Sequence, residues 1–169
     1  MDFKIGDKVV YPNHGVGVIE QISYGTLEGR TQTYYMLRIS SSALKVMVPC
    51  SNATAVGLRP VMRNSETIKV LGYIEKGKFN SHHDWKHRFK ENSERMKGGS
   101  LLEIAEVFKA LVLIQMSKPL SFREKKMLER ARSMLILETS VAKSVSEEGA
   151  IALIAKALAK CNLPMPAAL

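Results

Sequence analysis

The chain has 169 residues and a formal net charge of +9, with 25 lysines and arginines against 16 aspartates and glutamates. This length allows one domain or two small ones and excludes a large multidomain enzyme. Hydrophobic residues make up 46% and charged residues 24%, which is ordinary for a folded protein, so the positive charge does not belong to a disordered basic tail. We therefore expect a folded protein that binds a polyanion.

The sequence shows neither a secretory signal nor a membrane span. Charges at Asp2, Lys4 and Asp7 stand where a signal peptide needs an apolar run, and no later stretch reaches the ~20 apolar residues of a membrane helix. The cysteines, Cys50 and Cys161, match neither a disulfide framework nor a zinc-binding spacing. We expect a cytoplasmic protein without a metal or other cofactor.

The first 61 residues have the pattern of a small β domain. Short segments rich in β-branched and aromatic residues alternate with turn formers, and they predict strands over residues 8–11, 15–24, 31–39 and 44–48. Strands this short, at roughly ten-residue spacing, predict a small, strongly bent sheet or barrel.

The last predicted strand carries a candidate contact for another protein. Alternation turns Leu44, Val46 and Val48 toward the core and leaves Lys45 and Met47 outward. An outward methionine on an edge strand is either a tolerated apolar side chain or a soft contact for a partner strand that joins the edge. The residues alone leave both interpretations open.

After Val61 the hydrophobic period becomes helical. Ser65 can cap a helix over residues 66–76, and a second helix is expected from Asp84 to Lys97, where two glycines end it. Capping boxes predict three further helix starts, at Ser100 with Glu103, Ser121 with Glu124 and Ser144 with Glu147. The expected fold class is α+β, with a sheet domain at residues 1–61, a compact domain of about five helices at residues 62–161 and a flexible tail at residues 162–169.

The charge is concentrated in the helical part. Residues 61–132 hold 16 basic and 9 acidic groups and so carry +7 of the +9, whereas residues 1–60 hold 6 and 4. Such localisation is typical of nucleic-acid-binding proteins. It predicts that the helices bind the polyanion.

No catalytic motif accompanies these features. The nucleophile elbow, the zinc-protease helix, the phosphate-binding loop and the dinucleotide fingerprint are all missing, so we expect no enzyme. His82, His83 and His87 resemble a metal site at first sight, because His83 and His87 are four residues apart on a helix. Only Asp84 could extend this set, and the nearby lysines repel a cation, which favours histidines that add to the basic surface when protonated.

Trp85, the single tryptophan, begins the basic helix and has two interpretations. An aromatic residue at helical spacing with Phe89 and Met96 is most often a core anchor. In the first turn, however, a side chain can project past the helix end, and an apolar ring among cations is suited to insert between bases or stack on them.

Several of these segments together resemble the CarD/CdnL family of bacterial transcription regulators. They are residues 3–17 (FKIGDKVVYPNHGVG), 47–49 (MVP), 80–90 with Trp85, and 120–128 (LSFREKKML). The VVYP-x-HG start is also similar to the polymerase-interacting module of the transcription-repair coupling factor. The helical half with its tryptophan, and the lack of a helicase motor, favour CarD/CdnL.

This resemblance implies a Tudor-like N-terminal module that docks on the RNA polymerase β subunit and a helical domain that contacts promoter DNA near the −10 element. In the family, a tryptophan wedges into the minor groove at the upstream edge of the bubble and stabilises the open complex. The resemblance and the positive charge of the helices together imply a set of DNA-binding residues: Trp85, Lys86, Arg88, Lys90, Arg123, Lys125 and Lys126. The expected polymerase-binding residues are Arg38, Lys45, Met47 and Pro49.

Three positions depart from the family pattern, since Gly25, Met47 and His87 stand where some members carry arginine. At the first two, this leaves the polymerase contact more dependent on apolar packing. We expect a monomer that is associated with the nucleoid through RNA polymerase. The alternative from another functional class is an adaptor whose basic helices bind RNA or an acidic protein.

Overall fold

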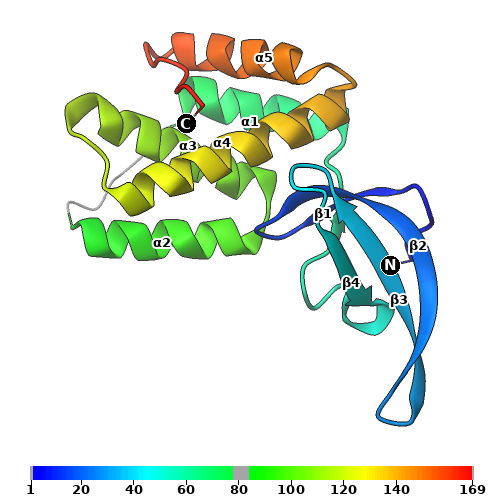
Figure 1. Ribbon diagram of the computed structural model, residues 1–169. Coiled ribbons are helices and arrows are strands. Elements are labelled where there is room, and N and C mark those ends of the chain that lie inside the picture. The colour runs from blue at the N-terminus through cyan, green and yellow to red at the C-terminus, as the bar shows by residue number, and fades with distance from the viewer. Residues whose placement is uncertain (1, 78–83, 169) are drawn as a thin grey trace. The chain divides into compact units, whose positions relative to one another are not determined.

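The computed structural model describes residues 2–77 and 84–168, with the backbone alone at Trp85. The chain divides into two compact units, Met1–Val61 and Met62–Leu169. The first contains a β-sheet and the second contains helices, as Figure 1 shows. The predicted α+β fold class is therefore confirmed.

Five strands form an antiparallel sheet in the N-terminal unit, in the order β4-β3-β2-β1-β5. The strands are β1 (Lys8–Tyr11), β2 (Gly15–Leu27), β3 (Arg30–Ile39), β4 (Lys45–Pro49) and β5 (Arg59–Pro60), and a short 3-10 helix, η1 (Cys50–Asn52), follows β4. All four predicted strands are present. The two-residue β5 was not predicted.

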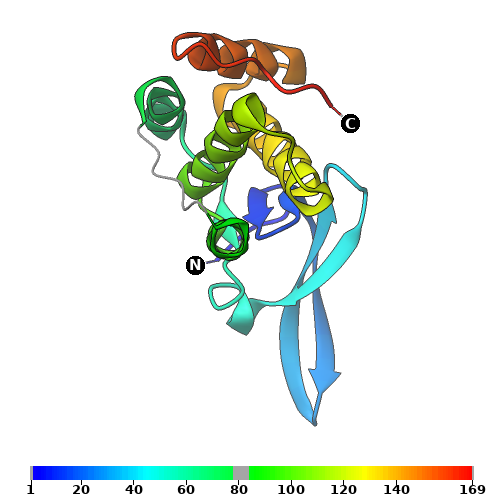
Figure 2. The ribbon, with the colours of Figure 1, turned by 90° about the vertical axis from the view of Figure 1, so that its left-hand side faces the viewer.

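Strands β2 and β3 form a long hairpin that extends away from the rest of the sheet in Figure 2. Glu28 and Gly29 at its turn both have positive φ, 51° and 76°, as a tight two-residue hairpin turn requires. Near the other end, the pairing register shifts between Ile19 and Gln21, which leaves Glu20 as a bulge. The bulge places the Glu20 carboxylate beside β3 and β4.

The core of this unit is closed by an aromatic pair. The rings of Phe3 and Tyr35 meet edge to face with their centroids 5.7 Å apart, and the Phe3 N–H donates to the Tyr35 hydroxyl over 3.2 Å. Burial raises the pKa of the Tyr35 phenol. Leu44, predicted to face this core, is instead 48% exposed, because Ala43 has a φ of 55° and turns the chain just before β4 begins.

Five helices occur in the described part of the C-terminal unit: α1 (Asn64–Lys76), α2 (Trp85–Gly98), α3 (Leu101–Ser117), α4 (Phe122–Lys143) and α5 (Glu147–Ala159). Helix α3 is the centre of the core, with Phe108 and Leu111 fully buried, and it packs against α1, α2 and α4. None of the described helices combines the length and the apolar composition that crossing a membrane requires.

Two predicted helix caps are confirmed and two are wrong. Ser100 and Ser121 accept hydrogen bonds from the N–H groups of Glu103 and Glu124, at 3.1 and 3.2 Å. Helix α1 begins at Asn64, so Ser65 lies inside its first turn and cannot cap it. Helix α5 is capped by Ser146, because α4 continues to Lys143 and ends on Ser144 in a left-handed conformation.

The C-terminal segment, expected as a flexible tail, makes contacts with the helices in the part that the structure describes. Leu163 is buried in the helical core and Met165 packs against it. The Nε of Arg132 on α4 donates to the carbonyl of Pro166 over 2.9 Å. Leu163 and Met165, on either side of Pro164, therefore anchor this irregular segment, although its composition suits neither a helix nor a strand.

Candidate nucleic-acid and polymerase interfaces

The first turn of α2 is held by Asp84. Its carboxylate accepts from the Lys86 N–H over 3.1 Å and lies 2.9 Å from Nδ1 of His87. The backbone hydrogen bond, and secondarily the histidine, lowers the pKa of the Asp84 carboxyl. Trp85 is the first residue of the helix, and Lys86, His87 and Lys90 are exposed around this turn. The cap therefore fixes where α2, and with it the Trp85 backbone, begins.

Arg88 does not take the place predicted for it on the DNA-binding surface. It is 4% exposed, and its guanidinium forms a bidentate ion pair with the Glu124 carboxylate on α4, with two hydrogen bonds of 3.1 Å. The Ser121 hydroxyl also donates to Glu124, over 3.1 Å. A buried arginine with a paired partner cannot reach a phosphate without leaving an uncompensated carboxylate behind, so Arg88 joins two helices instead.

This ion pair brings together the first turns of α2 and α4, which begin at the same end of the helical unit in Figure 1. Arg88 lies one turn after Trp85, and Glu124 lies in the first turn of α4. The predicted cations of α4, Arg123, Lys125 and Lys126, are all exposed beside this junction. The pair thus collects basic side chains from segments far apart in sequence.

An exposed ring lies among these cations. Phe122, the first residue of α4, is 72% exposed, and Nζ of Lys126 is 4.8 Å from its ring centroid. The guanidinium of Arg123 is 5.9 Å from the ring centroid of Phe89 on α2, which adds a second contact between the helices. Cations over aromatic faces are favourable by about 0.5–1 kcal/mol at exposed sites.

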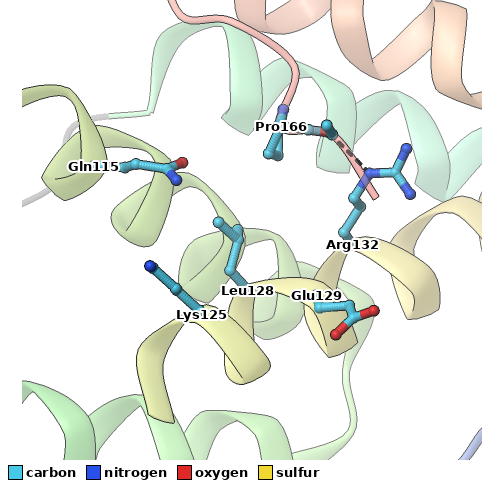
Figure 3. A pocket seen from close by; sticks show the side chains of 7 residues that line it. Gln115, Lys125, Leu128, Glu129, Arg132 and Pro166 are labelled. Carbon is cyan, nitrogen blue, oxygen red and sulfur yellow. Dashed lines mark hydrogen bonds between the residues drawn. The ribbon is translucent and has the colours of Figure 1, made fainter. Parts of the chain in front are cut away.

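Lys125 also borders a pocket between α3, α4 and the C-terminal segment. The pocket has a volume of about 340 Å³, and Figure 3 shows Lys125 and Arg132 entering it from α4, with Gln115 on α3 and Pro166 opposite. Leu128 lies near the middle of this view, and Glu129 also lines the pocket. The pocket is thus a mixed polar and apolar recess with no convergent catalytic groups.

The predicted polymerase-binding residues lie together on the outward face of β3 and β4. In the register of these strands, Arg38 is opposite Lys45, Met36 opposite Met47, and Tyr34 opposite Pro49. Met47 is 55% exposed, whereas the alternate residues Val48 and Tyr35 face the core. The alternation of a half-buried sheet therefore places all four predicted side chains on one surface.

Glu20 organises the charged end of this surface. Its carboxylate lies 2.6 Å from Nε of Arg38 and 3.9 Å from Nζ of Lys45. Two cations directly opposite one another across an antiparallel pair repel, and the bulged glutamate between them offsets that repulsion. Among the described strands β4 pairs with β3 alone, so its other edge is open to a further strand.

Several residues of these surfaces escaped sequence reasoning. Glu124 reads as half of a capping box, and nothing local indicates that it pairs with Arg88, 36 residues away. The exposure of Phe122 could have been predicted from its spacing. It stands six positions before Leu128, so it does not share the apolar face of its helix. Glu20 and Met36 needed the strand register.

The histidine cluster is described only in part. His82 and His83 lie outside the described residues, and His87 pairs with Asp84. Within the described ranges no three metal-ligating side chains come together.

Comparison with known proteins decides the family. Residues 3–62 match the family model of the CarD-like/TRCF RID domain, and residues 69–155 match the model of the CarD C-terminal domain. The chain belongs to the CarD family. CarD family proteins are transcription regulators that interact with RNA polymerase, and they are generally not enzymes.

The chain is also similar to individual proteins of known sequence or structure. The chain is 36% identical over 146 residues to the Bacillus subtilis (strain 168) protein YdeB, an alignment that covers 86% of this chain and 95% of YdeB. The solution structure of the N-terminal domain of Myxococcus xanthus CarD is 34% identical, with a TM-score of 0.31, over 35% of this chain and 79% of that one. The M. xanthus structure titled CdnLNt is 39% identical, with a TM-score of 0.32, over 37% and 87%.

Proposed function

We propose that this CarD family protein binds the β subunit of RNA polymerase and stabilises the open promoter complex, with Trp85 wedged into the minor groove at the upstream edge of the bubble. The observation that carries the proposal is the buried Arg88–Glu124 pair. It joins the first turns of α2 and α4. The helix that begins with Trp85 therefore starts among exposed cations from both helices.

The energetics suit DNA that is already open. Unstacking a base step costs a few kcal/mol, and an aromatic side chain stacked on an exposed base recovers about 1–3 kcal/mol. A wedge therefore gains more from a melted junction than from an intact duplex. Lys86, Lys90, Arg123, Lys125 and Lys126 would position the protein on phosphates, without reading the base sequence.

Polymerase docking is assigned to the outward face and open edge of β4. Met47 and its neighbour Met36 supply soft apolar contacts, Arg38 and Lys45 supply charge, and the unpaired edge can accept a strand of the β subunit. Docking would raise the local protein concentration at the promoter, so the DNA contact itself can be weak.

The test measures the lifetime of promoter open complexes after a competitor is added. We expect Trp85→Ala to shorten that lifetime while polymerase binding is unchanged, because the substitution removes the wedge and leaves β4 intact. Met47→Glu should weaken binding to the β subunit, because it places an uncompensated charge in an apolar contact.

Two results would contradict the proposal. If the open-complex lifetime were the same with Trp85→Ala as with the unchanged protein, Trp85 would not act as a wedge. Binding to RNA or acidic proteins as strong as binding to promoter DNA, without retention of the β subunit, would favour the adaptor function instead.

A further inference from the structure

Phe122 is an aromatic residue that does not pack in the helical core. It is the first residue of α4, immediately after the cap Ser121, and 72% of its surface is exposed. The buried stripe of the same helix runs through Leu128, Ala131 and Leu135, which do not share a face with it. Single exposed apolar residues are common, so the surroundings of the ring decide whether it has a role.

Those surroundings are strongly basic. Lys126 stands one turn later with Nζ 4.8 Å from the ring centroid, and the exposed side chains of Arg123 and Lys125 lie in the same two turns. The carboxylate within this stretch, Glu124, is buried against Arg88 and does not offset the exposed charge. The ring therefore sits in a patch whose charge complements a phosphate backbone.

The ion pair also relates Phe122 to Trp85. Glu124 follows Phe122 by two residues and Arg88 follows Trp85 by three, so the first turns of both helices flank the same buried contact. Arg123, which follows Phe122 directly, also contacts α2, because its guanidinium lies 5.9 Å from the ring centroid of Phe89. The two aromatic residues thus belong to one basic end of the helical unit.

We propose that Phe122 is a second aromatic contact to promoter DNA, packing on sugars and exposed base surface next to the position of Trp85, while Lys126 and Arg123 reach the adjacent phosphates. This inference rests on the proposed function, because it assigns another residue to the same interface. DNA is favoured over a protein partner because the exposed charged side chains next to the ring, Arg123, Lys125 and Lys126, are all cationic.

The experiment compares Phe122→Ala with Trp85→Ala and with Ile68→Ala in the full chain, each bound to RNA polymerase on a promoter. Ile68 is the matched control, since it is an apolar side chain on α1 that is 66% exposed. We expect Phe122→Ala to shorten the open-complex lifetime by about fivefold or more, a factor that corresponds to the lower range of base stacking, and Ile68→Ala to leave it unchanged.

The salt dependence of the lifetime separates a ring contact from a charge effect. Phe122→Ala removes no charge, so we expect the same slope against salt concentration as in the unchanged protein. A reduced slope would mean that the ring only positions Lys126, and it would overturn the inference.

The outcomes for the two aromatic residues are distinguishable. A shorter lifetime for Trp85→Ala but not for Phe122→Ala would overturn this inference and leave the proposed function in place. A benzophenone amino acid at position 122 should crosslink to DNA near the bubble in the open complex. Crosslinking to a polymerase subunit alone would assign the ring to a protein contact instead.

Discussion

The buried arginine of α2 illustrates how little a residue type says about its role. Arg88 lies in a basic helix with Lys86 and Lys90. Its guanidinium is buried in the helical unit, whereas the two lysine side chains are exposed. Its planar fork fits the Glu124 carboxylate with two parallel hydrogen bonds. At the scale of single residues, the ion pair is therefore a structural contact that joins α2 and α4 beneath the proposed DNA-binding surface.

This role predicts a large loss of stability. Arg88→Ala should lower the free energy of unfolding of the helical unit by about 3–5 kcal/mol, because it leaves the Glu124 carboxylate buried without a partner. Lys90→Ala, two residues later on the exposed side of the helix, should change it by no more than about 0.5 kcal/mol. Urea unfolding followed by circular dichroism at 222 nm measures both. Equal stability of the two variants, with DNA binding lost only in Arg88→Ala, would restore Arg88 as a phosphate contact.

The helices differ in whether the residue that caps them is the one that the sequence pattern predicts. Ser121 and Ser100 cap their helices where the capping-box pattern predicts, but at α5 the same pattern points to Ser144, two residues too early. Helix α4 extends to Lys143 and ends on Ser144 in a left-handed conformation, so Ser144 belongs to the end of α4 and the cap of α5 is Ser146.

Two substitutions distinguish the caps of α5. Ser146→Ala should lower the stability of the helical unit by about 1 kcal/mol, because the Gly149 N–H loses its acceptor. Ser144→Gly should have no cost and can gain up to about 1 kcal/mol, because Ser144 has a φ of 54° that glycine adopts readily. Chemical denaturation measures both. A cost for Ser144→Gly together with none for Ser146→Ala would mean that the helix begins at the earlier serine.

In the molecule as a whole, the cluster of cations and the sheet edge with its exposed apolar side chain belong to different units. The helical unit collects cations at the starts of α2 and α4, and the sheet unit presents Met47 on an open strand. Under the proposed function, a weak, salt-sensitive DNA contact and a specific protein contact act together because one continuous chain carries both.

The DNA contact should depend on salt in proportion to the phosphates it engages. Lys125→Ala should reduce the slope of the logarithm of the DNA association constant against the logarithm of salt concentration by about 1, because one phosphate contact is lost. Lys156→Ala, which removes an exposed lysine of α5, should leave the slope unchanged. Fluorescence anisotropy with a labelled promoter duplex provides the constants. The assignment of DNA binding to the start of α4 fails if both variants behave alike.

Much of this protein followed from local pattern alone. The strands, the helical second half, two serine caps and the outward side chain of Met47 all depend on residues within a few positions of one another, so period and turn chemistry were sufficient to predict them. The family resemblance likewise rested on short runs such as VVYP-x-HG.

The tertiary structure decided what depended on distant partners. It buried Arg88 against a carboxylate 36 residues away, left Phe122 exposed among cations, and packed the C-terminal segment on α4 through Leu163 and Arg132. Each of these outcomes depends on which side chain from another element fills the adjacent space. Charge localisation alone predicted a basic surface, but only packing determined which of its cations face the solvent.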